Sequence, residues 1–404
     1  MAVRYCDFDA VERADFDTVV VGSGFAGSVM ARELAERAGA RVLVIEKRAQ
    51  IGGNMYDEPD AAGVLVHRYG PHIFHTNDKR AFDYVRRFTA WRDYEHRVLA
   101  NWYGTYMPVP FNKTSMEIAF GPEKAARLTA KLVETFGDER KVTITELRAQ
   151  DDPELSEVAD FIYENVFLHY TMKQWGQTPD EVDPSVTARV PVFLSRDDRY
   201  FQDAYQGMPA DGYTPLFENM LDHPNILVCL NTEAERVFGL NFAGDEADAP
   251  LASISILGAP FDGRIVYTGP LDELFLGRFG RLPYRTLEFV YETFDEERVQ
   301  PCGTVNYTVS EDYTRITEFK HLTGQVCPAT TIMKEYSRAY EDPSAQIPYY
   351  AIINEQNLAH YGRYRALVDP LPNFYPLGRL AEYRYYNMDV IIGRALALAD
   401  ELVG

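Results

Sequence analysis

Three of the eight histidines in the chain fall within nine residues: His67, His72 and His75, in and beside the segment RYGPHIFHTN. Histidine is the commonest metal ligand and the side chain that titrates nearest neutral pH, so the cluster could be a metal site, a catalytic base or a packing feature. No cysteine or carboxylate with ligand spacing accompanies the His-x-x-His pair. The Gly70-Pro71 step predicts a stiff loop and not a regular ligand-bearing helix. The sequence therefore argues against a metal site, and it predicts a structural role for His67.

Two arginines are candidates for holding an anion. The chain carries 40 Lys+Arg against 61 Asp+Glu, a formal net charge of −21, and a field of this sign repels nucleic acid and anionic membranes. An anionic ligand therefore depends on individual arginines. Arg189 lies in the proline-flanked segment PSVTARVPV, and Arg315 lies in YTRITEF, where strand alternation would place Tyr313, Arg315, Thr317 and Phe319 on one face. A guanidinium can hold phosphate through two parallel hydrogen bonds, although a surface ion pair is the alternative for either residue.

The segment DTVVVGSGFAGSVMARELAERAGARVLVIEK predicts a βαβ unit that binds a dinucleotide. A short apolar run, typical of a buried strand, precedes Gly22, Gly24 and Gly27 at G-x-G-x-x-G spacing; a helical pattern and a second strand ending at Glu46 follow. The glycines allow a tight turn, close approach to a pyrophosphate and close helix–strand packing, and the acid can accept hydrogen bonds from ribose hydroxyls. The cofactor contacts expected from this unit are Gly22, Gly24, Phe25, Ala26, Gly27, Glu46 and Lys47.

Two further features favour FAD over NAD as this dinucleotide. A second glycine pair, Gly52-Gly53, follows soon after Glu46 and resembles the FAD-dependent amine-oxidase and reductase superfamily, where backbone passes close to the cofactor. The last helical pattern, which Asn387 or Asp389 can cap, follows GR and MD dipeptides that carry the same resemblance, so its positive N-terminus is expected to face the flavin pyrimidine. The further cofactor contacts expected are Gly53, Asn54, His72, Ile73, Gly378, Arg379, Met388 and Asp389.

The elements that must position these residues predict a discontinuous α/β fold. Residues 112 to about 195 read as helices, whereas residues 285–337 alternate and are rich in Thr, Val and Tyr, as an antiparallel sheet is. NILVCL and GRIVYTG predict strands that return to the nucleotide domain. The boundaries expected are an acidic leader, 1–15; a Rossmann-like FAD-binding domain, 16–92, 200–270 and 345–404; an inserted α-helical domain, 112–199, with a mobile lid around 176–195; and an antiparallel sheet domain, 93–111 and 271–344.

The cysteines and the N-terminus indicate the compartment. The four cysteines are scattered and form no CxxC pair, so a reduced cytoplasmic protein is the simpler interpretation. The N-terminal segment is acidic and lacks the apolar core of a signal peptide, and no apolar run is long enough to predict a transmembrane helix.

Several long motifs in order resemble the bacterial UDP-galactopyranose mutases. They are GPHIFHT, MPVPFN, YTMKQWG, VTARVPVF, QGMPADGYTPLFENML, VYTGPLDELF, YTRITEFKHL, IPYY and LGRLAEYRYYNMD, and the match runs from about Phe16 to the C-terminus. The resemblance implies an isomerase that interconverts UDP-galactopyranose and UDP-galactofuranose without net redox change and supplies galactofuranose for cell-surface glycans. It implies FAD in its reduced form, whose N5 acts as the nucleophile on the anomeric carbon and displaces UDP.

The same resemblance assigns roles to residues whose spacing alone indicates only packing. Arg189, on the lid, and Arg315 are implied as the catalytic pair that holds the diphosphate, and His75 as a catalytic residue beside the flavin. The substrate contacts implied are Phe167, Tyr170, Trp175, Arg189, Tyr200, Arg315, Tyr350, Arg379, Tyr385 and Asn387. Asn387 departs from the aspartate common in bacterial members, so a role that needs ionisation is not expected there.

Two rival functions stay open from the sequence. One is an FAD-dependent oxidoreductase of the amine-oxidase type, and the other is a catalytically silent protein that binds a nucleotide sugar or flavin. The resemblance further implies a homodimer and a reductant such as NAD(P)H or a reductase, and no partner among nucleic acids or membranes is expected.

Overall fold

A five-stranded parallel sheet forms the centre of the nucleotide-binding part. The computed structural model describes residues 2–11, 16–176 and 191–404. The sheet has the order β12 (Ile226–Cys229), β2 (Val42–Ile45), β1 (Thr18–Val21), β16 (Arg264–Tyr267) and β22 (Phe374–Pro376). All four pairings are parallel, and the apolar strands are buried on both faces, as such sheets require. The strands come from three separate parts of the chain, which confirms the discontinuous Rossmann-like fold.

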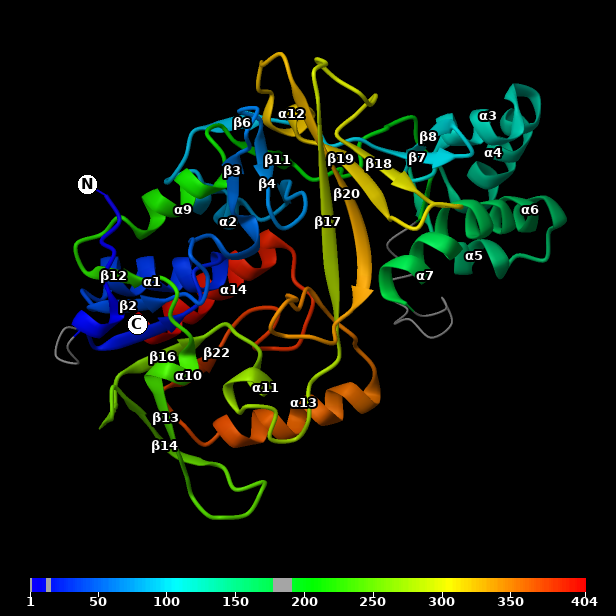
Figure 1. Ribbon diagram of the computed structural model, residues 1–404. Helices are drawn as coiled ribbons and strands as arrows, with labels where there is room; N and C mark the ends of the chain where they lie inside the picture. The colour runs from blue at the N-terminus through cyan, green and yellow to red at the C-terminus, as the bar shows by residue number, and fades with distance from the viewer. Residues whose placement is uncertain (1, 12–15, 177–190) are drawn as a thin grey trace.

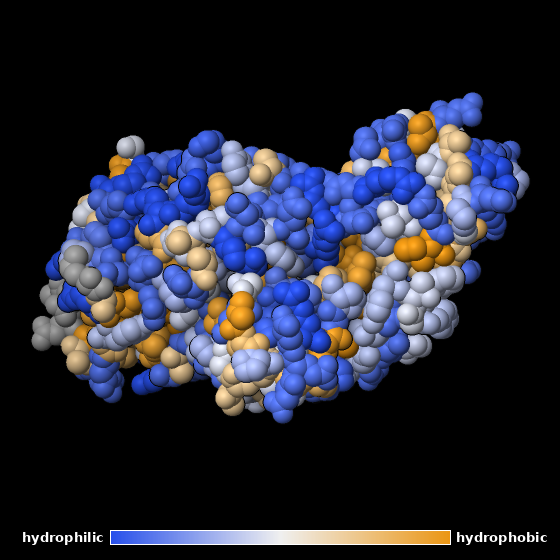
Figure 2. Space-filling model, turned by 90° about the horizontal axis from the view of Figure 1, so that it is seen from above, coloured by the Kyte–Doolittle hydropathy of each residue, from blue (hydrophilic) through white to orange (hydrophobic). Residues whose placement is uncertain are grey.

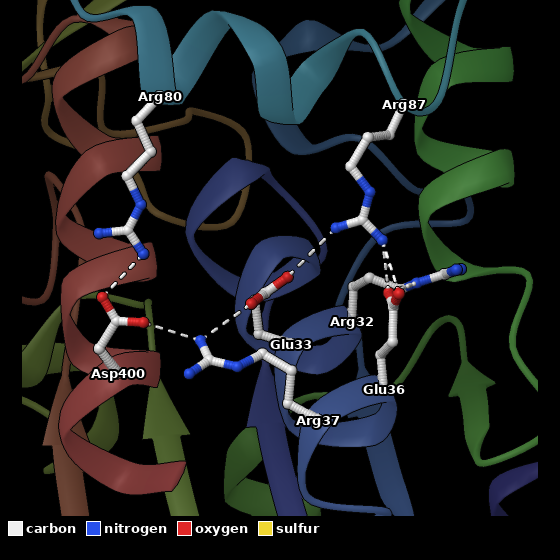
Figure 3. A network of polar contacts seen from close by, with 7 residues as sticks. All are labelled: Arg32, Glu33, Glu36, Arg37, Arg80, Arg87 and Asp400. Atoms are coloured by element: carbon white, nitrogen blue, oxygen red, sulfur yellow. Dashed lines mark hydrogen bonds and ion pairs between the residues drawn. The ribbon is translucent and has the colours of Figure 1, made fainter. Parts of the chain in front are cut away.

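Helices pack on one face of this sheet and enclose the largest core. They are α1 (Phe25–Arg37), α2 (Lys79–Val85), α9 (Tyr213–Leu221) and α14 (Met388–Val403). Ion pairs join the outer surfaces of α1, α2 and α14, with Asp400 bound to Arg37 at 2.8 Å and to Arg80 at 2.7 Å (Figure 3). A second core on the opposite face lies under α10 (Ala234–Val237), α11 (Leu271–Leu274), α13 (Glu355–Val368) and the antiparallel strands β13 (Phe238–Phe242), β14 (Leu251–Ile256) and β15 (Ala259–Pro260).

The N-terminal segment adds an edge to the parallel sheet. Tyr5 pairs in parallel with Val228 on β12, ahead of the short helix η1 (Phe8–Ala10). Cys6 forms a disulfide with Cys229, across 223 residues of sequence. The expectation of reduced cysteines is therefore wrong for this pair, because a long-range strand contact that no local spacing reveals brings the two together. Cys302 and Cys327 are outside disulfides, and no helix among the described residues is long and apolar enough to cross a membrane.

A seven-stranded sheet stands beside the nucleotide-binding part (Figure 1). Its order is β21 (Tyr350–Ala351), β17 (Tyr284–Phe294), β20 (Thr330–Ala339), β19 (Arg315–Glu318), β18 (Thr304–Tyr307), β7 (Val98–Trp102) and β8 (Thr105–Val109). All pairs are antiparallel except β18 with β7. β19 ends at Glu318, and α12 (Phe319–Thr323) begins at the next residue. Phe319 therefore does not continue the strand face that alternation predicted for Arg315.

The helical region forms a lobe at one end of the elongated molecule (Figure 2). It contains α3 (Lys113–Phe120), α4 (Pro122–Phe136), α5 (Ile144–Arg148), α6 (Pro153–Ile162), the π-helical segment η4 (Tyr163–Leu168) and α7 (His169–Trp175), with β9 (Lys141–Val142) pairing β10 (Val192–Phe193). A third core lies inside this lobe. Short strands complete the fold: β3 (Asp57–Pro59) pairs β4 (Leu65–His67), and β11 (Tyr205–Pro209) lies between β5 (Phe74–Thr76) and β6 (Trp91–Asp93).

Candidate functional site

A cavity of about 660 Å³ opens at the carboxyl ends of β1, β2 and β16. Ligands of open α/β sheets bind at this edge of the strands. Most of the cofactor residues predicted from the sequence line it: Gly22, Gly24, Phe25, Ala26, Glu46, Lys47, Gly53, Asn54, His72, Gly378, Arg379 and Met388. Gly27, Ile73 and Asp389 lie next to these residues along the chain but do not line the cavity.

The glycine turn has the backbone that a pyrophosphate site requires. Gly22 has a φ of +94°, and a Cβ atom on Gly27 would lie 1.9 Å from the carbonyl oxygen of Gly22. A Cβ on Gly53 would lie 3.0 Å from the Cα of Gly24, so the two glycine loops touch. Gly22 and Gly27 leave no room for a side chain, and α1 begins at Phe25, which lines the cavity.

Glu46, on the cavity wall, is fixed by its own neighbours. Its carboxylate accepts hydrogen bonds from the backbone N–H and hydroxyl of Ser23, at 2.9 and 2.7 Å, and from the backbone N–H of Arg48 at 3.0 Å. The side chain of Arg48 donates to Asn54 at 2.9 Å and stacks on Tyr69. Arg48 lines the cavity and was not predicted, because one arginine after an acidic residue carries no spacing signal.

At the other end of the cavity, His72 is held in a neutral, oriented state. Its Nδ1 lies 2.8 Å from the Gly70 carbonyl oxygen, and its backbone N–H donates to Nδ1 of His67 at 3.1 Å. Desolvation lowers the pKa of His72 to about 3, and the charges of His67 and Arg379 act in the same direction. His72 therefore offers a neutral imidazole near neutral pH. The buried His67 packs against Tyr213 and Phe319, consistent with its predicted structural role.

The N-terminus of α14 reaches the same end of the cavity. Asn387 occupies the position before the helix, but its side chain makes no capping hydrogen bond. Asp389 instead accepts from the Thr76 hydroxyl at 2.8 Å, and its second carboxylate oxygen is buried without a partner among the described residues. Contrary to expectation, neither side chain caps the helix. The first backbone N–H groups of α14 therefore remain available to a negatively charged ligand.

A cluster of tyrosines surrounds Arg315 beside the cavity. Arg315 donates from Nε and Nη2 to one carboxylate oxygen of Glu335, at 2.9 and 2.7 Å. Although burial opposes it, the Glu335 carboxylate raises the pKa of Arg315 above its ordinary value, with Tyr170 and Tyr350 close enough to contribute. Desolvation raises the pKa of Tyr170, so its hydroxyl stays a neutral donor.

The tyrosine cluster connects to Arg379 at the cavity wall. The rings of Tyr350 and Tyr385 are 6.0 Å apart, and the Arg379 guanidinium lies 4.5 Å from the Tyr385 ring centroid. Arg379 also donates to the Tyr386 carbonyl oxygen at 2.5 Å. The structure thus brings together most of the predicted substrate residues, namely Tyr170, Tyr200, Arg315, Tyr350, Arg379 and Tyr385.

His75 and His96 flank this cluster. Nδ1 of His75 lies 2.7 Å from a carboxylate oxygen of Asp203, and its ring stacks on Phe201 at 3.5 Å; it does not line the cofactor cavity. His96 is 4% exposed and lies 5.8 Å from the Tyr200 ring. Burial lowers the pKa of His96 to about 3, and Arg315 acts in the same direction. His96 was not predicted, because a lone histidine in DYEHRV carries no spacing signal.

The remaining predicted substrate residues are placed differently. Phe167 is 3% exposed and lies in the core of the helical lobe, on the π-helical segment η4. Arg189 lies outside the described residues, as does the side chain of Trp175, the last residue of α7. Among the described residues, no three His, Cys, Asp or Glu side chains come together as metal ligands would.

The sheet, the glycine turn and the cavity define a Rossmann-type dinucleotide-binding protein, with a second, cationic and tyrosine-rich site beside the cofactor position. The model of a family described as "UDP-galactopyranose mutase" matches residues 165–385, and that of an "NAD(P)-binding Rossmann-like domain" matches residues 20–88. The chain belongs to the UDP-galactopyranose mutase family of enzymes.

Relatives match nearly the whole chain. A probable UDP-galactopyranose mutase of Klebsiella pneumoniae is 36% identical, covering 95% of this chain and 94% of the relative. A dTDP-fucopyranose mutase of Escherichia coli is 34% identical, covering 95% and 97%. Among solved structures, a reduced UDP-galactopyranose mutase superposes with a TM-score of 0.68 at 15% identity (96% and 94% covered), and a redesigned putrescine oxidase with 0.54 at 13% identity (96% and 99% covered). These two structures show the shared fold.

Proposed function

We propose that this chain is a UDP-galactopyranose mutase that interconverts UDP-galactopyranose and UDP-galactofuranose and requires FAD in its reduced form. The observation that carries the proposal is the adjacency of a dinucleotide cavity and the Arg315–tyrosine cluster, joined by Arg379 and Tyr385. A diphosphate held by this cluster would place its sugar next to the end of the cavity formed by His72 and α14.

The residues present fit FAD. The glycine turn would receive the pyrophosphate, Glu46 a ribose, and the N-terminus of α14 the flavin pyrimidine edge, where positive dipole favours negative charge. When bound and reduced, this cofactor supplies the nucleophile for the anomeric carbon, its N5. His72 and Arg379 lie on the cavity wall at that end, so they would orient the flavin and the sugar.

The chain's other residues hold and release UDP. Arg315, fixed by Glu335, would bind a phosphate, and Tyr170, Tyr200, Tyr350 and Tyr385 would donate hydroxyl hydrogen bonds to the diphosphate. Trp175, at the end of α7, would contact the uracil, whereas Phe167 packs in the core of the lobe behind it, and Asn387 would hydrogen-bond the ligand as an uncharged amide. Arg189 would hold UDP near the sugar after it is detached, and His75 would act next to the flavin and sugar. Retaining UDP in place keeps its effective concentration high for the return step.

A second substrate has a specific observation in its favour. The dTDP-fucopyranose mutase of Escherichia coli is nearly as similar to this chain as the Klebsiella relative, at 34% against 36% identity. A thymidine-diphosphate 6-deoxysugar would use the same diphosphate contacts.

The test is conversion of UDP-galactofuranose to UDP-galactopyranose, followed by chromatography, with the enzyme first oxidised and then reduced by dithionite. Turnover only after reduction is expected. Flavin reoxidation in step with substrate consumption would instead support an oxidoreductase. UDP binding without turnover in either form would support a silent nucleotide-sugar binder, and faster turnover of dTDP-fucopyranose would identify the second substrate.

Partners and compartment complete the proposal. We infer a homodimer that acts in the cytoplasm, receives electrons from NAD(P)H or a reductase, and supplies galactofuranose for cell-surface glycans. Sedimentation and cell fractionation test the first two statements.

A further inference from the structure

The last turn of α7 is fastened to the seven-stranded sheet by contacts that the proposed chemistry does not use. α7 lies beside β20 (Figure 1). Arg285, on β17, donates from Nε to the Gln174 carbonyl oxygen at 3.3 Å and from Nη2 to the Lys173 carbonyl oxygen at 3.4 Å. Ser337, on β20, donates to the Gln174 carbonyl oxygen at 2.6 Å and accepts from Arg285 at 3.1 Å. A cation and a hydroxyl therefore satisfy carbonyl groups at the helix C-terminus, where they would otherwise lack partners.

A second set of hydrogen bonds joins α7 to the sheet, and here the helix side chain of Lys173 is the donor. Its ammonium group donates to the carbonyl oxygens of Tyr307, Glu311 and Tyr313, at 2.5, 2.9 and 3.2 Å. These carbonyls lie at the end of β18 and in its connection to β19, and the last of them, on Tyr313, comes two residues before Arg315. The position of α7 is thereby tied to the turn that delivers the phosphate-binding arginine.

The backbone of Arg285 holds the other side of the tyrosine cluster. Arg285 pairs with Tyr350 in the register of β17 and β21, and its carbonyl oxygen accepts from the Tyr349 N–H at 2.9 Å. One residue thus holds Tyr350 through its backbone and the helix of Tyr170 through its side chain. Gly176 leaves room for this arrangement, because a Cβ there would lie 2.7 Å from Nη1 of Arg285.

We propose that Arg285 is a positioning residue for the mutase site, which fixes Tyr170 on α7 relative to Arg315 and Tyr350 through the carbonyl groups of Lys173 and Gln174. The inference rests on the proposed function, since it assigns UDP to this cluster. Among the described residues, Arg285 does not line the cofactor cavity, so its loss is expected to weaken UDP binding and to leave FAD in place.

The test measures binding of UDP to the FAD-loaded full chain and the steady-state constants for UDP-galactofuranose. Arg285→Met should raise the Kd of UDP and the KM by about ten-fold, while kcat changes less than about three-fold. The FAD content and absorbance spectrum should match the wild type. Arg285→Lys, which restores one cationic donor, should recover part of the affinity. If Arg285→Met does not fold, Ser337→Ala should weaken UDP binding by about three-fold by removing one link to the Gln174 carbonyl.

The matched control is Arg338→Met. Arg338 lies on β20 next to Ser337 and forms a half-exposed ion pair with Glu288. Its substitution removes the same positive charge close to Arg285, but it removes no hydrogen bond or ion pair with a described residue of α7. Its UDP affinity should stay within about two-fold of wild type. Equal UDP affinity in wild type and Arg285→Met, or equal losses in Arg285→Met and Arg338→Met, would overturn the positioning role. Absence of UDP binding by the wild type would instead contradict the proposed function itself.

The double variant Arg285→Met/Tyr170→Phe distinguishes a positioning role of Arg285 from a merely structural one. If Arg285 acts through Tyr170, the loss in Arg285→Met and the loss in Tyr170→Phe will not add in the double variant. Full additivity would mean that Arg285 stabilises the lobe without positioning this tyrosine.

Discussion

Arg315 is the residue whose environment most constrains the chemistry. Glu335 is fully buried and accepts hydrogen bonds from Nε and Nη2 of the guanidinium. Nη1 has no hydrogen-bond partner among the described residues. These two hydrogen bonds fix the orientation of the guanidinium. Because the whole chain is strongly acidic, the diphosphate binding that we propose depends on this local cation.

The first prediction concerns the geometry of this cation. Arg315→Lys keeps the charge but loses the planar fork, so kcat/KM should fall by about 100-fold or more while FAD stays bound. Lys334→Met, which removes a cation from the pair with Glu292 on the neighbouring strand, should stay within about two-fold of wild type. Steady-state kinetics with dithionite-reduced enzyme checks both. Activity within about five-fold of wild type in Arg315→Lys would mean that a point charge suffices.

The second prediction concerns two histidines in desolvated positions, the half-buried His72 and the buried His96. His72 and His96 have pKa values of about 3, below the ordinary value of 6.5, so the unfolded chain binds protons that the folded chain does not between these pH values. Stability should therefore fall as pH decreases below 6.5, by up to about 1.4 kcal/mol per pH unit for each histidine. Asp272, whose pKa burial raises to about 6, has the opposite sign and offsets one histidine between pH 6 and 4.

The pH dependence of urea denaturation provides the measurement. His96→Gln should have a smaller slope between pH 6.5 and 4.5 than the wild type. His169→Gln, at an exposed position on α7, should keep the wild-type slope. Identical slopes in wild type and His96→Gln would show that His96 titrates normally.

At the scale of elements, charged side chains connect the helices that cover the parallel sheet. Figure 3 shows Arg87, which follows α2, reaching Glu33 and Glu36 on α1, while Arg37 of α1 reaches Asp400 on α14. Glu33 is the buried member of this network, with a side chain 6% exposed, whereas that of Glu36 is 39% exposed. The first turn of α14 lines the cavity, so this network helps to fix a cavity-lining helix from its outer side.

The third prediction follows from that difference in burial. Glu33→Gln removes the charge between Arg37 and Arg87 in a desolvated position, so it should lower the free energy of unfolding by about 1–3 kcal/mol. Glu36→Gln, an exposed pair, should cost less than about 1 kcal/mol. Thermal and urea denaturation of the two variants would decide the matter. Equal effects of the two substitutions would mean that burial does not determine how much each ion pair contributes to the free energy of unfolding.

Elements with strong local signals were predictable, and those fixed by distant partners were not. The βαβ unit around Gly22 follows from local glycine geometry and apolar periodicity, and the structure reproduces it. The end of β19 at Glu318 was missed because alternation in YTRITEF continues past the residue where α12 begins. Arg48 was missed because a single arginine carries no spacing signal, and His96 was missed because it contacts Tyr200, which is far away in the sequence.

At the scale of the whole molecule, the chain crosses repeatedly between three cores. The parallel sheet takes strands from before and after the helical lobe, and the seven-stranded sheet takes β7 and β8 from before it. Residues of one site therefore come from all parts: His72 before the lobe, Tyr170 within it, and Arg315 and Arg379 after it. Relative placement of these parts, more than any single element, decides whether the site is complete.

The disulfide between Cys6 and Cys229 extends this coupling to the N-terminal segment. Both family-model matches, 20–88 and 165–385, leave that segment out, yet the Cys229 carbonyl oxygen accepts from the N–H of Glu46 at 2.9 Å. The bond therefore joins the N-terminal segment to a strand whose end supports the cofactor cavity. A cross-link over 223 residues restricts the unfolded chain strongly, by roughly 5 kcal/mol at most in a chain-entropy account.

The fourth prediction is that breaking this bond destabilises the nucleotide-binding part. Cys6→Ser should lower the Tm of the wild-type chain by a few degrees, and dithiothreitol should lower the wild-type Tm to the same value without further effect on Cys6→Ser. FAD should also dissociate faster, because Glu46 loses a rigid support. Cys302→Ser, at a cysteine outside the disulfide, should keep the wild-type response to dithiothreitol.

Calorimetry with and without the reductant measures the shift, and alkylation under denaturing conditions counts the thiols. Four alkylated thiols in the untreated protein, with a Tm that does not respond to dithiothreitol, would show that the bond does not form. The N-terminal segment would then be held by its noncovalent contacts, among them the backbone pairing with Val228 and the packing of Val11.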